Sequence, residues 1–203
     1  MYIPKVYRQE DREEILAFLQ QNDFPALVTY DGIQPVATHL PVEVVERKEG
    51  LTIYGHLSRA NPQWKAFAGQ EALLIFQGPH TFISARWYNH VNVPTWNYMI
   101  LHVYGTVREV SGDELYALLS RLVRKHESNS SYRLEGLPQA FVENEIKGVV
   151  GVAVDVTRLE AAYKLSQNRN DEDRGNVIRE LEKRDDRNSH AIAQAMRRQR
   201  GKP

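Results

Sequence analysis

The sequence predicts a mainly antiparallel α+β protein, a barrel or a sandwich of about six strands with helices at its periphery. Two observations predict this class. Short segments with strand-like alternation follow one another, separated by turn residues and by few helices. The alternating strand and helix units of a doubly wound parallel sheet are missing. With 203 residues, 42% of them hydrophobic, the chain can bury a sizeable core, and we favour the barrel.

The first half is expected to begin with a helix and to continue as an antiparallel meander. Asp11 is expected to cap the helix, and Glu14, three residues later, completes a capping box. Three strands are then expected, at 26–30, 35–45 and 51–55. Turn residues separate them, first Asp31-Gly32 and then a segment that ends at Gly50.

The second half is expected to add further strands and a strongly amphipathic helix. Strands are expected at 72–76, 81–84, 98–110 and 150–156, with a turn at 77–80 and a bulge at Gly105. Ser111 and Glu114 form a second capping-box pattern, ahead of leucines at helical spacing. A short helix is expected between Pro138 and Gly148. Two final helices, near 177–183 and 191–198, lack a full apolar stripe and are expected to dock on another part.

Composition excludes several classes of protein. With 26 basic and 26 acidic residues the net charge is zero, which excludes a body that coats nucleic acid nonspecifically. The absence of cysteine excludes disulfide scaffolds, zinc ribbons and a thiol nucleophile. No signal peptide or membrane-length apolar run is present, so we expect a soluble cytoplasmic protein with no membrane partner.

The C-terminal end carries a basic excess. Residues 164–203 hold eleven Lys and Arg against seven Asp and Glu. The last cations have no acidic neighbour in the sequence: Arg197, Arg198, Arg200 and Lys202. A solvated terminus is the favoured interpretation. Contact with DNA is the alternative.

Familiar catalytic and nucleotide-binding signatures are missing. No G-x-G-x-x-G follows a strand, and neither a P-loop nor H-E-x-x-H is present. Ser58 and Ser84 lack the G-x-S-x-G context of a hydrolase nucleophile. The seven histidines follow no ligand spacing. We therefore predict no metal site and single out no catalytic residue.

Rings and polar groups are concentrated in the middle of the chain. All three tryptophans, and nine aromatic residues in total, lie between Trp64 and Tyr104, and five of the seven histidines lie between His39 and His102. A barrel core with amphipathic rings at its rim explains this density. A site for a planar heteroaromatic ligand with a phosphate explains it as well, with the rings and Leu40-Pro41 flanking the ligand plane.

The sequence offers one group of phosphate ligands. Arg59, with Ser58 and Asn61 as neutral donors, would hold a phosphate in a forked, charge-assisted contact. The alternative for Arg59 is an exposed turn arginine. His39 and His56 would either donate to the ligand or satisfy a buried carbonyl.

Several motif blocks carry a resemblance that covers nearly the whole chain. They are Tyr2-Ile3-Pro4, Thr38-His39-Leu40-Pro41, Gly55-His56, Ser58-Arg59-Ala60-Asn61-Pro62-Gln63, Gly78-Pro79-His80, Trp87-Tyr88, Val93-Pro94-Thr95-Trp96-Asn97-Tyr98, His102-Val103-Tyr104-Gly105 and Lys164-Leu165-Ser166-Gln167-Asn168. In these blocks the chain resembles the PaiB family, FMN-binding negative transcriptional regulators that in Bacillus repress protease synthesis and sporulation. One departure is Ala85, where the family usually has proline.

The resemblance implies FMN as the cofactor and the split barrel of the pyridoxamine-phosphate oxidases, built as a homodimer with the flavin at the subunit interface. The barrel would occupy residues 1–163, and residues 164–203 would form a helical, partly basic extension. The implied cofactor-binding residues are Thr38, His39, Leu40, Pro41, His56, Ser58, Arg59, Asn61, Trp96, Asn97, Tyr98, His102 and Lys164. Segment 164–168 would reach a pocket, which we infer to be the partner subunit's. Trp96 has the core or the barrel rim as its alternative, and Lys164 a solvated strand end.

The phosphate site differs from that of the oxidases. Ala60 stands where their turn has lysine, and segment 37–42 lacks their terminal arginine and lysine. Fewer cations would face the phosphate, so FMN affinity is expected to be weaker than in those enzymes.

The residues and the resemblance together leave three possible functions. The first is an FMN-binding homodimeric repressor, whose contact with DNA would be direct or through a partner. The second is a flavin-dependent oxidoreductase or flavin reductase, with His39, His102 or Tyr98 as its acid or base. Haem binding through a histidine is the third, although no histidine is marked as an axial ligand.

Overall fold

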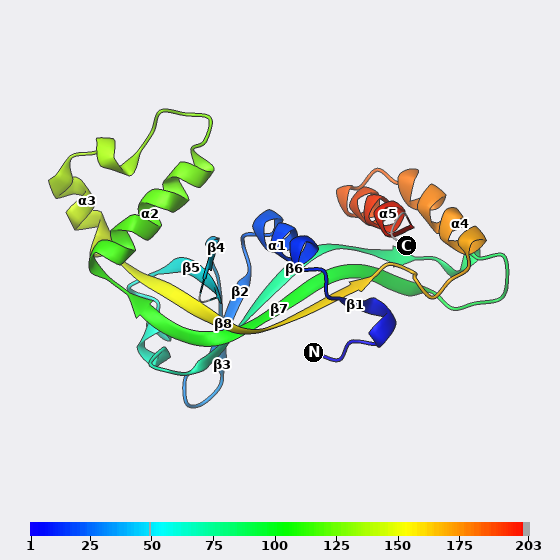
Figure 1. Ribbon diagram of the computed structural model, residues 1–203, viewed down its shortest axis with the longest axis horizontal. Coiled ribbons are helices and arrows are strands. Elements are labelled where there is room, and N and C mark those ends of the chain that lie inside the picture. The colour runs from blue at the N-terminus through cyan, green and yellow to red at the C-terminus, as the bar shows by residue number, and fades with distance from the viewer. Residues whose placement is uncertain (49, 201–203) are drawn as a thin grey trace. The chain divides into compact units, whose positions relative to one another are not determined.

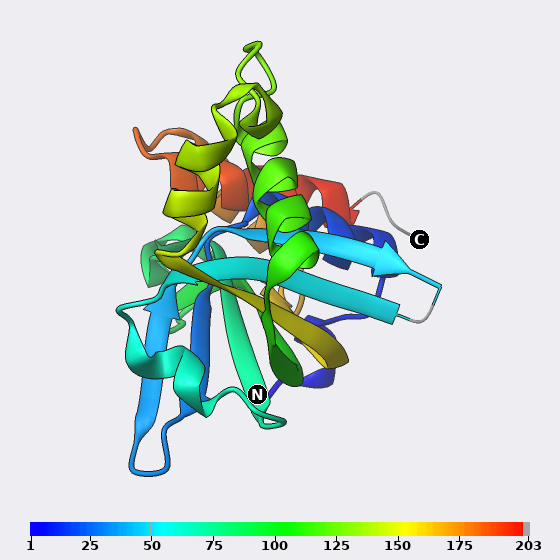
Figure 2. The same ribbon diagram turned by 90° about the vertical axis from the view of Figure 1, so that its left-hand side faces the viewer.

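A computed structural model describes residues 1–48 and 50–200 (Figures 1 and 2). The strands are β1 (Arg8–Gln9), β2 (Ala26–Tyr30), β3 (Pro35–His39), β4 (Val42–Arg47), β5 (Gly50–Ser58), β6 (Glu71–Ile83), β7 (Thr95–Val110) and β8 (Val149–Lys164). The α-helices are α1 (Arg12–Gln21), α2 (Gly112–His126), α3 (Gln139–Ile146), α4 (Asp171–Glu182) and α5 (Arg187–Arg200). Short 3-10 helices are η1 (Lys5–Tyr7), η2 (Pro62–Ala66), η3 (Ala85–Trp87) and η4 (Leu134–Gly136).

The described strands form one sheet in the order β3-β2-β6-β7-β8-β5-β4, and β1 pairs with β8. The chain divides into two compact units. The α2 unit comprises Leu19–Phe76 and His102–Leu159. The α4–α5 unit comprises Met1–Phe18, Gln77–Leu101 and Glu160–Pro203. The boundary predicted between residues 163 and 164 stays a prediction.

Segment 35–45 is two strands, and the predicted meander is therefore wrong. The Asp31-Gly32 turn is confirmed, because β2 and β3 form an antiparallel hairpin around it and Gly32 has a φ of +97°. After β3, however, the chain leaves β2, and β4 pairs only with β5. The N–H of Leu40 donates to Pro25 O and that of Val42 to Asp23 O, which fixes the crossing. β3 and β4 thus lie at opposite ends of the strand order.

The turn predicted at 77–80 is also wrong, because β6 is continuous through it. Gly78 lies beneath the Phe18 ring, where an added Cβ would come within 2.4 Å of Phe18 Cε2 and 3.1 Å of Met99 O. The glycine marks a close approach of α1 and β7 to the strand.

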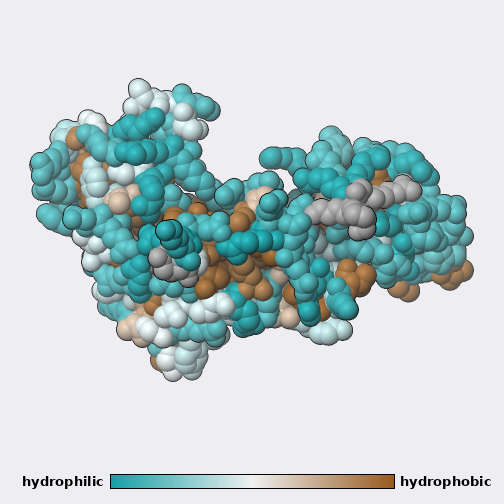
Figure 3. Space-filling model, viewed as in Figure 1, coloured by the Kyte–Doolittle hydropathy of each residue, from teal (hydrophilic) through white to brown (hydrophobic). Residues whose placement is uncertain are grey.

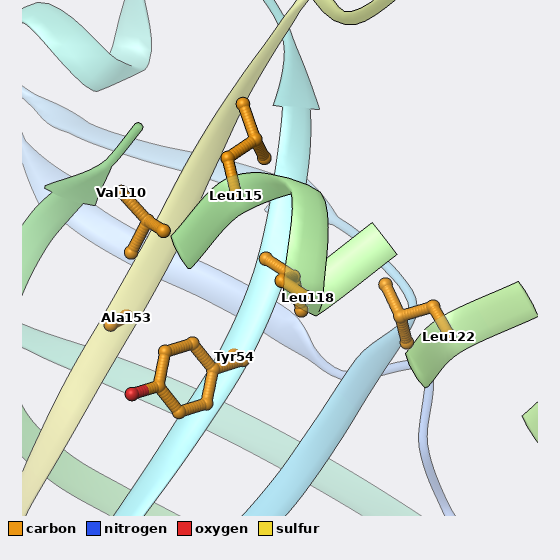
Figure 4. Packing of buried hydrophobic residues seen from close by; sticks show 6 residues of the cluster. All are labelled: Tyr54, Val110, Leu115, Leu118, Leu122 and Ala153. Carbon is orange, nitrogen blue, oxygen red and sulfur yellow. The ribbon is translucent and has the colours of Figure 1, made fainter. Parts of the chain in front are cut away.

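The core of the α2 unit is built on the predicted amphipathic helix (Figure 4). Buried side chains of α2 pack on β5, β7 and β8 in the cluster Tyr54, Val110, Leu115, Leu118, Leu122 and Ala153. Gly151 lets α2 approach, since a Cβ there would be 2.9 Å from Leu115 Cδ1. Arg121 also pairs with Glu43 of β4, and Figure 2 shows α2 in front of β4 and β5.

The capping box predicted at Ser111 does not form. Its side chain makes no capping hydrogen bond, and α2 begins at Gly112 with a φ of +57°. Glu114 instead accepts hydrogen bonds from Arg108, at 2.8 and 3.0 Å, and from the Tyr54 hydroxyl at 3.1 Å. The Glu114 carboxylate, which a capping box would need, is therefore engaged in a tertiary ion pair with Arg108.

In the α4–α5 unit the two C-terminal helices are longer than predicted and lie side by side (Figure 1, orange and red). Their facing side chains, Val177, Ile178, Leu181, Ile192 and Met196, are buried. The expected docking is confirmed, because Ser189 Oγ lies 3.0 Å from Thr81 Oγ1 of β6. Arg197, which has no acidic neighbour in the sequence, pairs with Glu182 across the two helices at 2.8 Å. Lys202 lies outside the described residues.

Candidate functional site

The turn that follows β5 holds the predicted phosphate ligands, and its arginine is fixed in place. Arg59 donates from Nε to Lys147 O at 2.9 Å and from Nη2 to Val149 O at 3.0 Å. Its guanidinium carbon lies 5.6 Å from the Trp64 ring centroid. These contacts hold the exposed side chain in one orientation. The Nη1 group has no hydrogen-bond partner among the described residues and remains able to bind an anion.

The backbone of this turn is already satisfied. The N–H of Arg59 donates to Gly148 O at 2.8 Å, and the N–H of Asn61 donates to Ser58 O at 2.9 Å. The N–H of Ala60 reaches Ser58 Oγ at 3.3 Å. A phosphate at this turn would therefore be held by side chains, namely the Arg59 guanidinium and the exposed Ser58 hydroxyl.

Thr38 and Asn61 are brought together, and they bind each other. Asn61 Nδ2 donates to Thr38 Oγ1 at 2.8 Å, and Thr38 in turn donates to Gln63 Oε1 at 2.6 Å. Gln63 is 2% exposed and donates to Leu27 O at 3.1 Å and Thr29 Oγ1 at 3.0 Å. This network fastens η2 to the β2–β3 hairpin. Gln63 was not among the predicted site residues, although the block Asn61-Pro62-Gln63 contained it.

His39, Leu40 and Pro41 differ in exposure. His39 is exposed, and its ring stacks on Phe24 at 6.0 Å. Pro41 is half-buried. Leu40 is 2% exposed and packs over Gly55, where an added Cβ would lie 2.7 Å from Leu40 Cδ1. Leu40 therefore contributes to the core, and its contact with a ligand stays a prediction.

His56 presents an unused ring nitrogen. Its Nδ1 atom is buried and has no hydrogen-bond partner among the described residues. Burial lowers the pKa of the imidazole below its ordinary value of 6.5, so the neutral ring is favoured. A neutral imidazole offers one donor and one acceptor. His102, also in the α2 unit, is half-buried and lies edge-on to Tyr104, with ring centroids 6.4 Å apart.

The other predicted residues belong to the α4–α5 unit, where β7 divides them between two faces. Asn97 is 0% exposed, and its amide exchanges hydrogen bonds with Ser166 Oγ at 3.0 and 3.2 Å. Ser166 has a φ of +60°, unusual for a residue with a side chain. Asn97 therefore holds the turn that follows β8. Trp96, on the opposite face, is 50% exposed, and its ring lies 5.5 Å from that of His80.

Tyr98 and Lys164 lie near Tyr7, a residue that was not among the predicted site residues. Lys164 Nζ donates to Thr95 Oγ1 at 2.5 Å and lies 5.9 Å from the Tyr7 ring centroid. Burial lowers the pKa of Lys164, and Arg169 lowers it further. The pKa of Tyr7 is raised by burial, and the neighbouring Tyr98 adds to this effect. This cluster joins an ammonium group and two phenols, a set able to move or share a proton.

The described residues include no cluster of three or more His, Asp or Glu side chains arranged to hold a metal ion. None of the helices that the structure describes has the length and apolar character required to span a membrane.

The donors at the β5–η2 turn fit the tail of FMN. A phosphate monoester needs cations and O–H or N–H donors on an accessible surface. Ser58 and the oriented Arg59 supply these, and His56, two residues before Ser58, adds a buried ring nitrogen without a partner among the described residues.

Comparison with known proteins also indicates FMN binding. A family model described as "Putative FMN-binding domain" matches residues 1–158. The chain is 41% identical over 199 residues to protease synthase and sporulation protein PAI 2 of Bacillus subtilis (strain 168), covering 97% of this chain and 96% of that protein.

Solved structures share the fold. The flavocytochrome Anf3 from Azotobacter vinelandii matches with a TM-score of 0.61 at 16% identity, over 80% of this chain and 72% of that one. The FAD and heme binding protein from Mycobacterium smegmatis gives 0.57 at 18% identity, over 78% and 73%. The predicted fold class, a mainly antiparallel split barrel with peripheral helices, is confirmed.

Proposed function

The chain belongs to the family of FMN-binding domains, as a relative of PAI 2 and with FMN as the family's cofactor, and from this premise we propose that it is a homodimeric, flavin-dependent negative regulator of transcription. The proposal includes a cytoplasmic location and flavin bound at the subunit interface. The observation that carries the flavin part is the geometry of Arg59, which two backbone carbonyls orient while Nη1 stays available.

Different residues would bind different parts of FMN. Arg59 and Ser58 would bind the phosphate, and the neutral His56 would donate to or accept from the cofactor. When bound, FMN supplies electron-transfer chemistry. Thr38 and Asn61 act on Arg59 through the turn, because their mutual hydrogen bond and Gln63 fix η2 immediately after it.

An open aromatic face supports the homodimer. On β6 and β7 of the α4–α5 unit, Phe82 is 39% exposed and Trp96 50% exposed, with ring centroids 6.4 Å apart. Val91 and Val93, in the connection between these strands, are also exposed. Figure 3 shows hydrophobic surface along the lower edge of this unit. Covering such a patch with a second copy would remove it from water.

Binding of FMN to the purified, flavin-stripped protein tests the phosphate assignment. We expect Arg59→Ala to weaken binding by about 10- to 100-fold, as for loss of a hydrogen bond to a charged group. Arg59→Lys should restore only part of it, because ammonium lacks the fork. The matched control is Arg133→Ala, a half-buried arginine that also donates to backbone carbonyls. Unchanged affinity in Arg59→Ala would refute the assignment.

The regulatory part requires a separate measurement. Labelled promoter DNA should bind the holoprotein at low salt, and affinity should fall as salt rises, because phosphate contacts release counterions. Arg198→Glu in α5 should weaken this binding if the basic C-terminal end makes the contact. Absence of binding at every salt concentration would limit repression to an indirect route through a partner.

A flavin-dependent oxidoreductase is the second candidate. The cluster of Tyr7, Tyr98 and Lys164 favours it, since these groups can transfer a proton during a reduction. Mixing the FMN-loaded protein with NADH or NADPH and following flavin absorbance distinguishes the two functions. Rapid bleaching supports the enzyme, whereas a stable flavin spectrum supports the regulator.

A further inference from the structure

The α4–α5 unit contains a cavity of about 370 Å³ that neither proposed function uses. Its walls come from both ends of the chain: the N-terminal segment through the first turn of α1, Met99 of β7, the end of β8, and the helices α4 and α5. The N-terminal wall is held by β1, where Arg8 pairs with Ala162 of β8. This volume is near the lower limit of pockets that hold small molecules.

Two buried polar atoms on this wall have no hydrogen-bond partner among the described residues. One is the Nε donor of Arg174, and the other is the Oε1 acceptor of Gln199. Arg174 uses Nη2 to donate to Met196 O at 3.3 Å, which fixes its side chain and leaves Nε available. Buried donors and acceptors are nearly always satisfied, since leaving one without a partner costs about 1–3 kcal/mol. A ligand that satisfies both needs an acceptor for Arg174 and a donor for Gln199.

The charges around the cavity favour an anion. Arg8, Arg174 and Arg198 line it, against two carboxylates, those of Asp11 and Glu14. Asp11 is engaged at the start of α1, where its Oδ1 accepts from the N–H groups of Glu13 and Glu14 at 3.1 and 3.2 Å. Arg8 in turn pairs with Glu10, outside the lining, at 3.7 Å. The arginines that line the cavity still outnumber its carboxylates.

We propose that this cavity binds a small carboxylic acid that also carries a hydroxyl or amino group. Its carboxylate would accept from Arg174, and its hydroxyl or ammonium would donate to Gln199. Arginine pairs with carboxylates in directed, charge-assisted hydrogen bonds, which gives the site its preference for this class. Because α5 and the N-terminal segment both line the cavity, the ligand would act as a small-molecule effector that fastens them to each other.

The cavity lies on the face of β7 opposite Trp96 and Tyr98. Side chains alternate along β7, and Met99 shares its face with Asn97, which reaches Met196 of α5. Trp96 and Tyr98 point to the opposite face of the strand. The inference therefore does not depend on FMN binding.

Titration of the full-length protein with three acids tests the proposal. The probes are malate, aspartate and succinate, which carry a hydroxyl, an amino group and neither. We expect malate or aspartate to raise the melting temperature and to bind at least tenfold more tightly than succinate, because only they offer the donor. A preference for malate identifies a hydroxy acid as the ligand class, and a preference for aspartate an amino acid.

Variants separate the two contacts. Gln199→Leu should remove the advantage of malate or aspartate over succinate. Arg174→Gln should weaken all three probes by about tenfold or more. Gln194→Leu and Arg179→Gln, at exposed positions on the same two helices, are the matched controls and should bind as the wild type does. Circular dichroism verifies that each variant is folded.

Three results would overturn the proposal: no probe binds the folded wild type, succinate binds as tightly as malate and aspartate, or the controls lose as much affinity as the cavity variants. Retained FMN affinity alongside any of these results would leave the proposed function intact.

Discussion

The residues of the motif blocks have different environments in the two compact units. In the α2 unit the residues of the motif blocks mainly bind one another: Asn61 donates to Thr38, and Gln63 reaches β2 from η2. In the α4–α5 unit Asn97 is likewise internal, yet its neighbour Trp96 is half exposed on an open face. A block of motif residues can therefore mark a hydrogen-bond network that shapes a turn, or a surface left available for a ligand or a partner.

The largest expected loss of stability in the α2 unit is for a substitution at Gly105 of β7. A Cβ added there would lie 2.3 Å from Asp155 O, a backbone atom that cannot move without opening β7 from β8. We expect Gly105→Ala to lower the free energy of unfolding by about 3 kcal/mol or more. Gly136→Ala is the matched control, since nothing lies within 4 Å of its added Cβ. Equal urea midpoints for the two variants would show that the strands are not this close.

The next largest effect is expected at the η2 network. Replacing Gln63 by Leu leaves Thr29 and the carbonyls of Leu27 and Val36 without their amide donor. The cost should be about 2–3 kcal/mol, and FMN binding should weaken as well because the turn loses its support. Urea denaturation and FMN titration measure the two effects. Gln34→Leu, at an exposed turn position, is the control, and a Gln63→Leu variant as stable as this control would contradict the proposed network.

The two predicted capping boxes provide a direct comparison between the units. Asp11 accepts hydrogen bonds from two N–H groups of α1, whereas Ser111 caps nothing. Asp11→Ala should therefore cost about 1 kcal/mol and Ser111→Ala about zero. Thermal melts of both variants measure this difference. A reversed order would mean that the start of α2 is misplaced.

The smallest effect is a pH dependence that originates in the α2 unit. Burial holds the pKa of His56 below 6.5 in the folded protein, so the unfolded chain binds more protons there between that lowered pKa and 6.5. Stability should accordingly fall as the pH drops below 6.5, and it should not change above it on account of this residue. His56→Gln should flatten the dependence, measured by urea titration at several pH values. The exposed His126→Gln should leave the slope unchanged.

Local patterns in the sequence predicted the local elements correctly, whereas tertiary contacts account for the errors. The leucine stripe of α2 and the Asp31-Gly32 hairpin were correct, since each depends on neighbours in the chain. Segment 35–45 splits because the N–H groups of Leu40 and Val42 pair with residues much earlier in the sequence. Arg197 finds Glu182, fifteen positions away, through the packing of two helices.

In the candidate site, too, local sequence predicts some features and tertiary contacts determine the others. Arg59 and Ser58 lie together at the turn after β5, and their role in binding phosphate stays a prediction. Gln63 and Tyr7 were missed, because burial under η2 and proximity to Lys164 are properties of the folded chain. Exposure of Trp96 likewise depends on which face of β7 the C-terminal helices cover.

Sedimentation velocity of the purified protein, recorded at the flavin and the protein absorbance bands together, measures whether the protein is a dimer that carries FMN. We expect a single boundary at the mass of a dimer, with FMN sedimenting in it at one flavin per chain, and loss of the flavin from that boundary in Arg59→Ala. A monomer, or a dimer that sediments without flavin when FMN is supplied in excess, would contradict this expectation.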